Sequence, residues 1–201
     1  GLSKEVYGIN MKEFAANTTG KAKTKNIATL ESLEVTYSIQ NIDKNIPTVA
    51  LKAKKKATGN QVASNTWSTD TLNFEFTSSN VGISGATIYY CQDRNNTCTP
   101  NKVATSGVLV TELNTLEDTY YVRYKIVNKA GYEGSVLSYT AKVDIRKPTI
   151  TSVTGNPTEW TNQDVTLTVN GAADNTGGSG LQASAYSFDN GATWQTGNTK
   201  T

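Results

Sequence analysis

Polar and apolar residues alternate with a period of two along several stretches of this chain. Residues 33–39 place Leu, Val, Tyr and Ile on one side of the chain and Glu, Thr and Ser on the other. Residues 72–76 and 120–126 follow the same pattern with Leu, Phe, Tyr, Val and Ile on one side. This alternation is typical of a β-strand with one buried face. We therefore predict strands in these three stretches and a closing strand over 136–143.

Two related octets divide the chain into repeats. Each reads as a β-branched residue, Asp, three variable residues, Pro-Thr and a second β-branched residue, at Ile42–Val49 and at Val143–Ile150. Their prolines lie 101 residues apart, which is the length of about one β-sandwich domain. We therefore predict the C-terminal part of a preceding repeat at 1–46, a complete sandwich at 47–147, and the N-terminal half of a further repeat at 148–201. With only three residues between Asp and Pro, successive domains are expected to sit end to end.

A tryptophan register repeats in the last two predicted domains. Trp67 and Trp160 are each followed by apolar residues five, seven and nine positions later. This spacing predicts one inward face on each following strand, so packing is favoured over ligand stacking for both tryptophans. The predicted structural core comprises Trp67, Leu72, Phe74, Phe76, Tyr120, Val122, Trp160, Val165, Leu167, Val169, Phe188 and Trp194.

Composition removes several classes of function. The apolar share is 36%, the net charge is +2 and histidine is absent. The absence of histidine takes away the commonest general base and the commonest metal ligand. The small net charge gives no nucleic-acid signal, and no apolar run approaches the roughly 18 residues of a membrane span. We predict no catalytic residue, no cofactor, no metal, no nucleic-acid partner and no membrane insertion in this segment. An export signal or anchor is expected outside it.

Cys91 and Cys98 are the only cysteines, and their spacing fits neither a redox Cys-x-x-Cys motif nor a zinc site. A structural disulfide in an oxidising compartment is favoured over a redox switch. Overlaying the two copies puts Cys91 at the position of Phe188 and Cys98 close to Trp194. A disulfide in one repeat would then take the place of an aromatic pair in the other.

The chain from residue 47 onwards resembles the bacterial immunoglobulin-like repeats that occur in tandem on secreted and wall-attached surface proteins. The resemblance is carried by the segments 120–124 (YYVRY), 128–131 (NKAG), 160–167 (WTNQDVTL), 178–181 (GSGL) and 186–194 (YSFDNGATW). It implies an all-β fold of tandem immunoglobulin-like β-sandwich repeats, one complete domain flanked by partial ones. It also implies that Tyr120 is the corner tyrosine of such a domain.

Two sites of possible chemistry remain open in the sequence. Some surface immunoglobulin-like domains carry a Lys–Asn cross-link formed beside a buried acid, but Lys125 and Glu75 both fall on outward positions. The segment 174–180 (DNTGGSG) offers oxygen ligands without the spaced acids of a defined calcium loop, so a flexible turn is favoured over a calcium site.

These observations favour a non-catalytic spacer in an extracellular protein, secreted or at the cell surface, as in an adhesin-like stalk. Its expected partners are the neighbouring repeats. The alternatives are a module that binds a host glycan or protein, or an accessory module of a secreted glycan-degrading enzyme. An enzyme is not expected, because no set of residues supports one.

Overall fold

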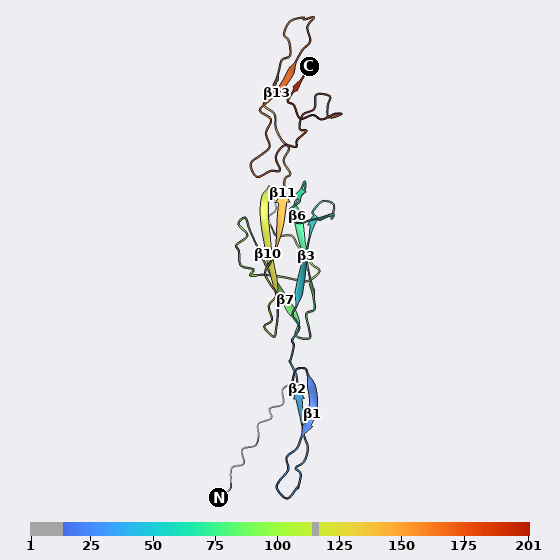
Figure 1. Cartoon of the computed structure of the whole chain (residues 1–201), viewed down its shortest axis with the longest axis vertical. Coiled ribbons are helices and arrows are strands. Elements are labelled where there is room, and N and C mark those ends of the chain that lie inside the picture. The colour runs from blue at the N-terminus through green and yellow to red at the C-terminus, as the bar shows by residue number, and fades with distance from the viewer. Residues whose placement is uncertain (1–13, 114–116) are drawn as a thin grey trace.

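The computed structural model describes residues 14–113 and 117–201. Within these residues the chain is all-β, with fourteen strands in four sheets and no helix. Accordingly, the described part contains no helix that is long and apolar enough to cross a membrane. Three groups of strands follow one another in a line (Figure 1). We call them the N-terminal module (18–39), the middle module (48–143) and the third module (152–200).

The N-terminal module is a two-stranded antiparallel hairpin. Strand β1 (Thr18–Ala22) pairs with strand β2 (Val35–Ile39), with Thr18 opposite Ile39. Strand β2 lies within the stretch in which the alternation predicts a strand. Tyr37 packs edge-on against Phe14 with 5.6 Å between the ring centroids.

The middle module consists of two sheets that share one core. The first sheet has the strand order β5-β11-β10-β7-β8, and the second has the order β4-β3-β6-β9. The nine strands are β3 (Thr48–Lys55), β4 (Gln61–Val62), β5 (Trp67–Ser68), β6 (Leu72–Ser79), β7 (Ala86–Asp93), β8 (Lys102–Ala104), β9 (Leu109–Val110), β10 (Asp118–Asn128) and β11 (Leu137–Val143). All contacts between neighbouring strands are antiparallel except β5 with β11.

Aromatic rings join the two sheets of the middle module. Phe76 of β6 stacks on Tyr90 of β7 at 5.3 Å and meets Tyr124 of β10 edge-on at 5.5 Å. Phe74 meets Tyr139 of β11 edge-on at 5.9 Å. Such pairs contribute about 0.5–1.5 kcal/mol beyond the burial of their surface. The alternation in the sequence therefore places its apolar face between the two sheets.

The predicted core residues of the middle module lie inside it, with one partial exception. Phe74, Phe76 and Val122 are fully buried, and Tyr120 is 7% exposed. Trp67 is half-buried at the edge of its sheet, where the ammonium of Lys142 lies 5.7 Å from its ring centroid.

The third module is a single three-stranded sheet in the described part of the chain. Strand β13 (Leu167–Asn170) lies between β12 (Ser152–Thr154) and β14 (Thr199–Lys200), and both pairings are antiparallel. Val169 is buried, whereas Val165 and Leu167 are half-buried. The stretch 185–188, predicted as a strand, forms only an isolated bridge between Tyr186 and Gln195.

The prediction that Trp160 and Trp194 belong to the core is wrong. Trp160 is fully exposed, Trp194 is 60% exposed, and Phe188 is half-buried. The expected aromatic pair between Phe188 and Trp194 is not among the ring contacts of the described residues. The physical reason is that the described residues of the third module form one sheet only, so no second sheet covers these side chains, whereas two sheets enclose the core of the middle module.

Candidate functional site

The first octet forms a buried contact with the middle module, which we call joint 1. It comprises Asp43, Asn45 and Ser84. The Oδ2 atom of Asp43 accepts hydrogen bonds from the backbone N of Ser84, at 2.9 Å, and from its hydroxyl. The Oδ1 atom accepts from the backbone N and the side-chain amide of Asn45, at 3.0 and 2.9 Å. These donors, the Ser84 hydroxyl first, hold the pKa of Asp43 far below its ordinary value.

Further contacts fasten the chain around joint 1. The side-chain amide of Asn128 donates to the carbonyl of Asn45 at 2.9 Å, and that of Asn80 donates to the carbonyl of Ile46 at 2.8 Å. Pro47 is fully buried. On the N-terminal side, the backbone N of Ile42 donates to the side chain of Asn17 at 2.8 Å. The octet is therefore held at both ends.

Joint 1 leaves no room for a side chain at residue 82. Gly82 has a φ of +68°, and a Cβ atom there would lie 2.3 Å from both carboxylate oxygens of Asp43. Glycine is required here for two reasons: the backbone is left-handed, and the carboxylate of Asp43 approaches it closely.

The second octet forms the equivalent contact with the third module, and we call it joint 2. It comprises Asp144, Glu117, Ser179 and the segment 174–180. The Oδ2 atom of Asp144 accepts hydrogen bonds from the backbone N and the hydroxyl of Ser179, at 2.7 and 2.6 Å. Ser179, through its hydroxyl and then its backbone N, lowers the pKa of Asp144. The same aspartate of the octet thus meets the serine of a Ser-Gly pair in the following module at both joints.

Glu117 holds the linker of joint 2 against the middle module. Its Oε1 atom accepts hydrogen bonds from the backbone N of Ile145 at 2.6 Å and of Arg146 at 3.1 Å. The Nε atom of Arg146 lies 3.4 Å from Oε2 of Glu117. The hydroxyl of Tyr120 donates to the carbonyl of Glu117 at 3.5 Å, which ties the start of β10 to the same point.

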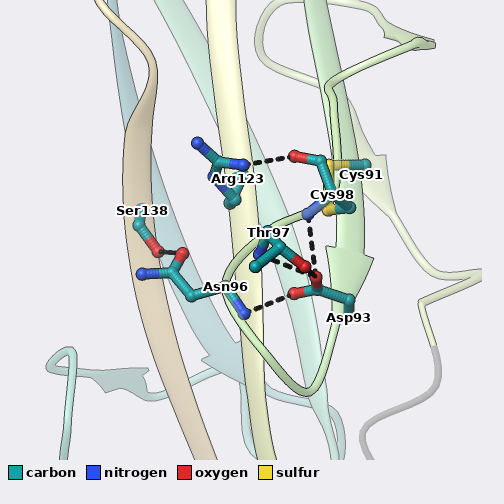
Figure 2. The surroundings of a disulfide bond; sticks show 7 residues. All are labelled: Cys91, Asp93, Asn96, Thr97, Cys98, Arg123 and Ser138. Carbon is teal, nitrogen blue, oxygen red and sulfur yellow. Dashed lines mark hydrogen bonds between the residues drawn. A yellow bond between two sulfur atoms is a disulfide. The ribbon is translucent and has the colours of Figure 1, made fainter.

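The disulfide hairpin lies at the same end of the middle module as joint 2. The structure pairs Cys91 with Cys98, with 6.2 Å between their Cα atoms. Figure 2 shows the carboxylate of Asp93 inside this loop, where its Oδ2 atom accepts from the backbone N of Thr97 and of Cys98, at 2.8 Å each. The guanidinium of Arg123 donates to the carbonyl of Cys98 at 2.6 Å.

Arg94 connects this hairpin to the beginning of β10. Its guanidinium lies 3.3 Å from the carboxylate of Asp118 and 5.4 Å from the centroid of the Tyr120 ring. Cys91 is buried. A buried sulfur in a loop fixed on several sides fits a structural bond better than a redox switch.

The two groups considered for an intramolecular cross-link are in separate ion pairs. Glu75 pairs with Lys54 at 2.5 Å, and this ammonium lowers the pKa of Glu75. Lys125 pairs with Glu133. Neither ion pair lies in the core, and Glu75 and Lys125 belong to different sheets, on β6 and β10.

A cleft of about 470 Å³ runs beside joint 2 in the third module. Pro148, Leu181 and Trp194 contribute apolar surface to it, and Ser179 also lines it. The cleft offers a surface on which a flat apolar ligand could stack.

The sequence identifies the octets as boundaries but misses what they contact. Ser84 and Ser179 stand in the Ser-Gly pairs that both copies share, and that shared position was the available signal. Glu117 gives no local signal of a role at joint 2. Comparison with protein-family models, with curated proteins and with solved structures found no match for this chain.

Proposed function

We propose that this segment is a non-catalytic spacer of tandem immunoglobulin-like β-sandwich modules in a secreted or cell-surface protein. The observation that carries the proposal is the repeated contact between the aspartate of the octet and the serine of the next module. A contact formed in the same way at two boundaries sets the direction of each module relative to the one before it. A stalk needs linkers that fix the direction of each module in this way.

The short linkers support this proposal. Few residues separate the modules, and their backbone groups are bonded to Asn128, Asn80 and Glu117. Linkers fastened in this way lose the freedom of a Gly/Ser-rich chain. The three modules consequently follow one another along one axis (Figure 1).

The details of the middle module support an immunoglobulin-like fold and an oxidising location. The Tyr120 hydroxyl bonds to a backbone carbonyl three residues upstream, as the corner tyrosine of such domains does. The disulfide between Cys91 and Cys98 fits a chain that folds outside the reducing cytosol.

Small-angle X-ray scattering of residues 1–201 tests the spacer role. The expected result is an elongated particle whose maximum dimension matches three modules in a line. The double variant Asp43→Asn, Asp144→Asn should widen the distribution of particle shapes. The variant Asp189→Asn is the matched control, because Asp189 bonds only within its own turn, to Ser187 and Thr193. A compact particle for the unmodified chain would refute the spacer role.

The cleft lined by Trp194 and Leu181 favours a second candidate function, a module that binds a host glycan or protein. Exposed tryptophan faces stack readily on the apolar faces of sugar rings. A glycan array probed with residues 1–201 tests this candidate. Binding that Trp194→Ala abolishes would support it, and an array without signal would remove it.

A further inference from the structure

The third module repeats part of the middle module strand by strand. Its sheet, with the order β12-β13-β14, corresponds to β3, β6 and β9 of the middle module. Leu167 and Phe74 both stand seven residues after a tryptophan, and Leu167 pairs with β14 as Phe74 pairs with β9. The bridge from Tyr186 to Gln195 corresponds to the pairing of β7 with β8. Within the described residues, the third module contains no counterpart of β10 and β11.

The middle module shows what these two strands contribute. Strand β10 lies between β7 and β11 in the five-stranded sheet and places Val122 and Ile126 in the core. Among the described residues, the segment 185–188, which corresponds to β7, pairs only through the bridge to Gln195. Trp194 beside it is 60% exposed. An unpaired strand edge next to exposed apolar side chains is a surface to which a further strand can be added.

The N-terminal module has the two strands that the third module lacks. Strands β1 and β2 form an antiparallel hairpin, as β10 and β11 do, and β2 leads into the first octet as β11 leads into the second. Asn41, with a φ of +65°, lies between β2 and the first octet. The backbone therefore turns there, and the correspondence holds between strands and not between single residues.

One face of the N-terminal hairpin is apolar and uncovered. Val35, Tyr37 and Ile39 alternate along β2, and they share this face with Ala22 of β1, which lies opposite Val35. Val35 is 66% exposed, and Leu33, which continues the alternation, is 90% exposed. An isolated two-stranded hairpin is only marginally stable in water. Burying this face against a second surface would therefore stabilise the hairpin.

The two modules carry opposite net charge. Residues 18–39 hold three lysines and two glutamates, whereas residues 152–200 hold one lysine and four acidic residues. Opposite charges on two surfaces favour their encounter and orient them. Figure 1 shows these modules at opposite ends of one chain, with the middle module between them. A single chain therefore cannot bring the two together, and the partner that fits is a second copy.

We propose that the N-terminal module of one chain inserts into the third module of a second copy, with β1 beside the segment 185–188 and β2 beside β1. In the middle module, β10 and β11 hold these places beside β7. Main-chain hydrogen bonds to 185–188 supply affinity, and the apolar face of the hairpin covers Leu167 and Trp194. The contact joins two different surfaces at opposite ends of the chain, so repeated copies extend into a head-to-tail filament. This assembly goes beyond the spacer role, because it lengthens the stalk by whole chains.

Sedimentation velocity of residues 1–201 over a series of protein concentrations tests the assembly. The average mass should rise with concentration past that of a dimer, because each added copy presents another N-terminal module or another third module. Amide exchange at 185–188 should slow as the mass rises, since the inserted strand protects these backbone groups.

Two variants of the full chain each block one surface. Val35→Glu places a carboxylate on the inserted face, and Trp194→Glu places one on the receiving face. Both side chains are exposed in the single chain, so neither change should unfold it. Each variant alone should associate roughly a hundredfold more weakly, because an unpaired charge would be buried. An equimolar mixture of the two should form a dimer and nothing larger, since it retains one intact surface of each kind.

Val103→Glu is the matched control, because Val103 is 63% exposed and lies on the middle module. This variant should assemble as the unmodified chain does.

A chain that stays monomeric at every concentration would overturn the proposal, and so would assembly that leaves exchange at 185–188 unchanged. Equal weakening by Val103→Glu would contradict it, as would a mixture of Val35→Glu and Trp194→Glu that stays monomeric or grows beyond a dimer. Scattering at the lowest concentration measures the elongation of the single chain separately. A failed assembly is therefore distinguishable from a failed spacer.

Discussion

Joints 1 and 2 both join an aspartate to a serine, but they differ in how many hydrogen bonds the aspartate accepts. In each, an aspartate accepts two hydrogen bonds from the serine of the next module. At joint 1 the other carboxylate oxygen is bonded to Asn45 and the following proline is fully buried. At joint 2 the other oxygen has no donor, and Pro148 is exposed.

This difference follows from which residues surround each aspartate. Asn45 stands two residues after Asp43 and supplies two donors, whereas the corresponding Arg146 donates its backbone N to Glu117. Joint 1 is therefore complete with protein groups alone. Joint 2 carries an additional carboxylate, that of Glu117, which accepts from the linker instead of donating to Asp144. A single repeated motif thus yields one aspartate with four hydrogen bonds and one with two.

Removing the disulfide should give the largest effect and should act on the side of joint 2. The double variant Cys91→Ser, Cys98→Ser opens a loop closed over a separation of seven residues. On the chain-entropy estimate this costs about 2.5 kcal/mol, which lowers the melting temperature of the middle module by about 10–20 °C. Calorimetry measures the shift. Amide exchange should quicken more near Arg94 and Asp118 than near Ser84, and equal quickening at both ends would contradict this.

Replacing Gly82 should disrupt joint 1 alone. Gly82→Ala and Gly85→Ala both force an alanine into a left-handed backbone, at about 1–2 kcal/mol each. A Cβ atom on Gly85 meets nothing within 4 Å, whereas one on Gly82 meets the Asp43 carboxylate. Gly82→Ala should therefore lower the melting temperature further than the control does and should loosen joint 1. If the two variants melt at the same temperature, the carboxylate does not approach residue 82 as closely as described.

Acidification should open joint 2 before joint 1. Both aspartates have pKa values below their ordinary 3.8, so each contact contributes fully above pH 3.8 and is lost as the pH falls through its folded value. The pKa is lowered further at Asp43, because four hydrogen bonds stabilise its carboxylate. Carbon-detected NMR of the two carboxyl groups between pH 5 and pH 2 shows which aspartate becomes protonated first. If Asp43 becomes protonated at a higher pH than Asp144, this prediction is wrong.

The strands of the middle module could be predicted from the sequence because burial there follows the period-two alternation. Phe74 and Phe76 face inward, as their spacing from Trp67 predicts. The same spacing misplaces Trp160, because alternation states which side of a strand is apolar and not whether another sheet covers that side. Whether the N-terminal residues 1–13 contribute a strand lies outside the described residues.

The joints could be predicted only in part. The repeated octet marks Asp43 and Asp144, but their partners Ser84 and Ser179 lie 41 and 35 residues further along the chain. Contacts over such distances depend on how the modules fold, which no local pattern encodes. The segment 174–180 likewise gives no local sign that it meets Asp144, which comes near Ser179 only in the folded chain.

Distance distributions across the two joints test the central claim most directly. Spin labels on cysteines at the exposed positions Thr36 and Asn101 span joint 1, and labels at Asn101 and Ser152 span joint 2, with the native disulfide intact. Pulsed dipolar spectroscopy should give a narrow distribution across both joints of the unmodified chain. Asp43→Asn should broaden the distribution across joint 1 alone, and Asp144→Asn should broaden it across joint 2 alone, because each removes the charged acceptor of its own joint. A broad distribution across both joints of the unmodified chain, or no broadening by either variant, would contradict the account of joints that set the direction of the modules.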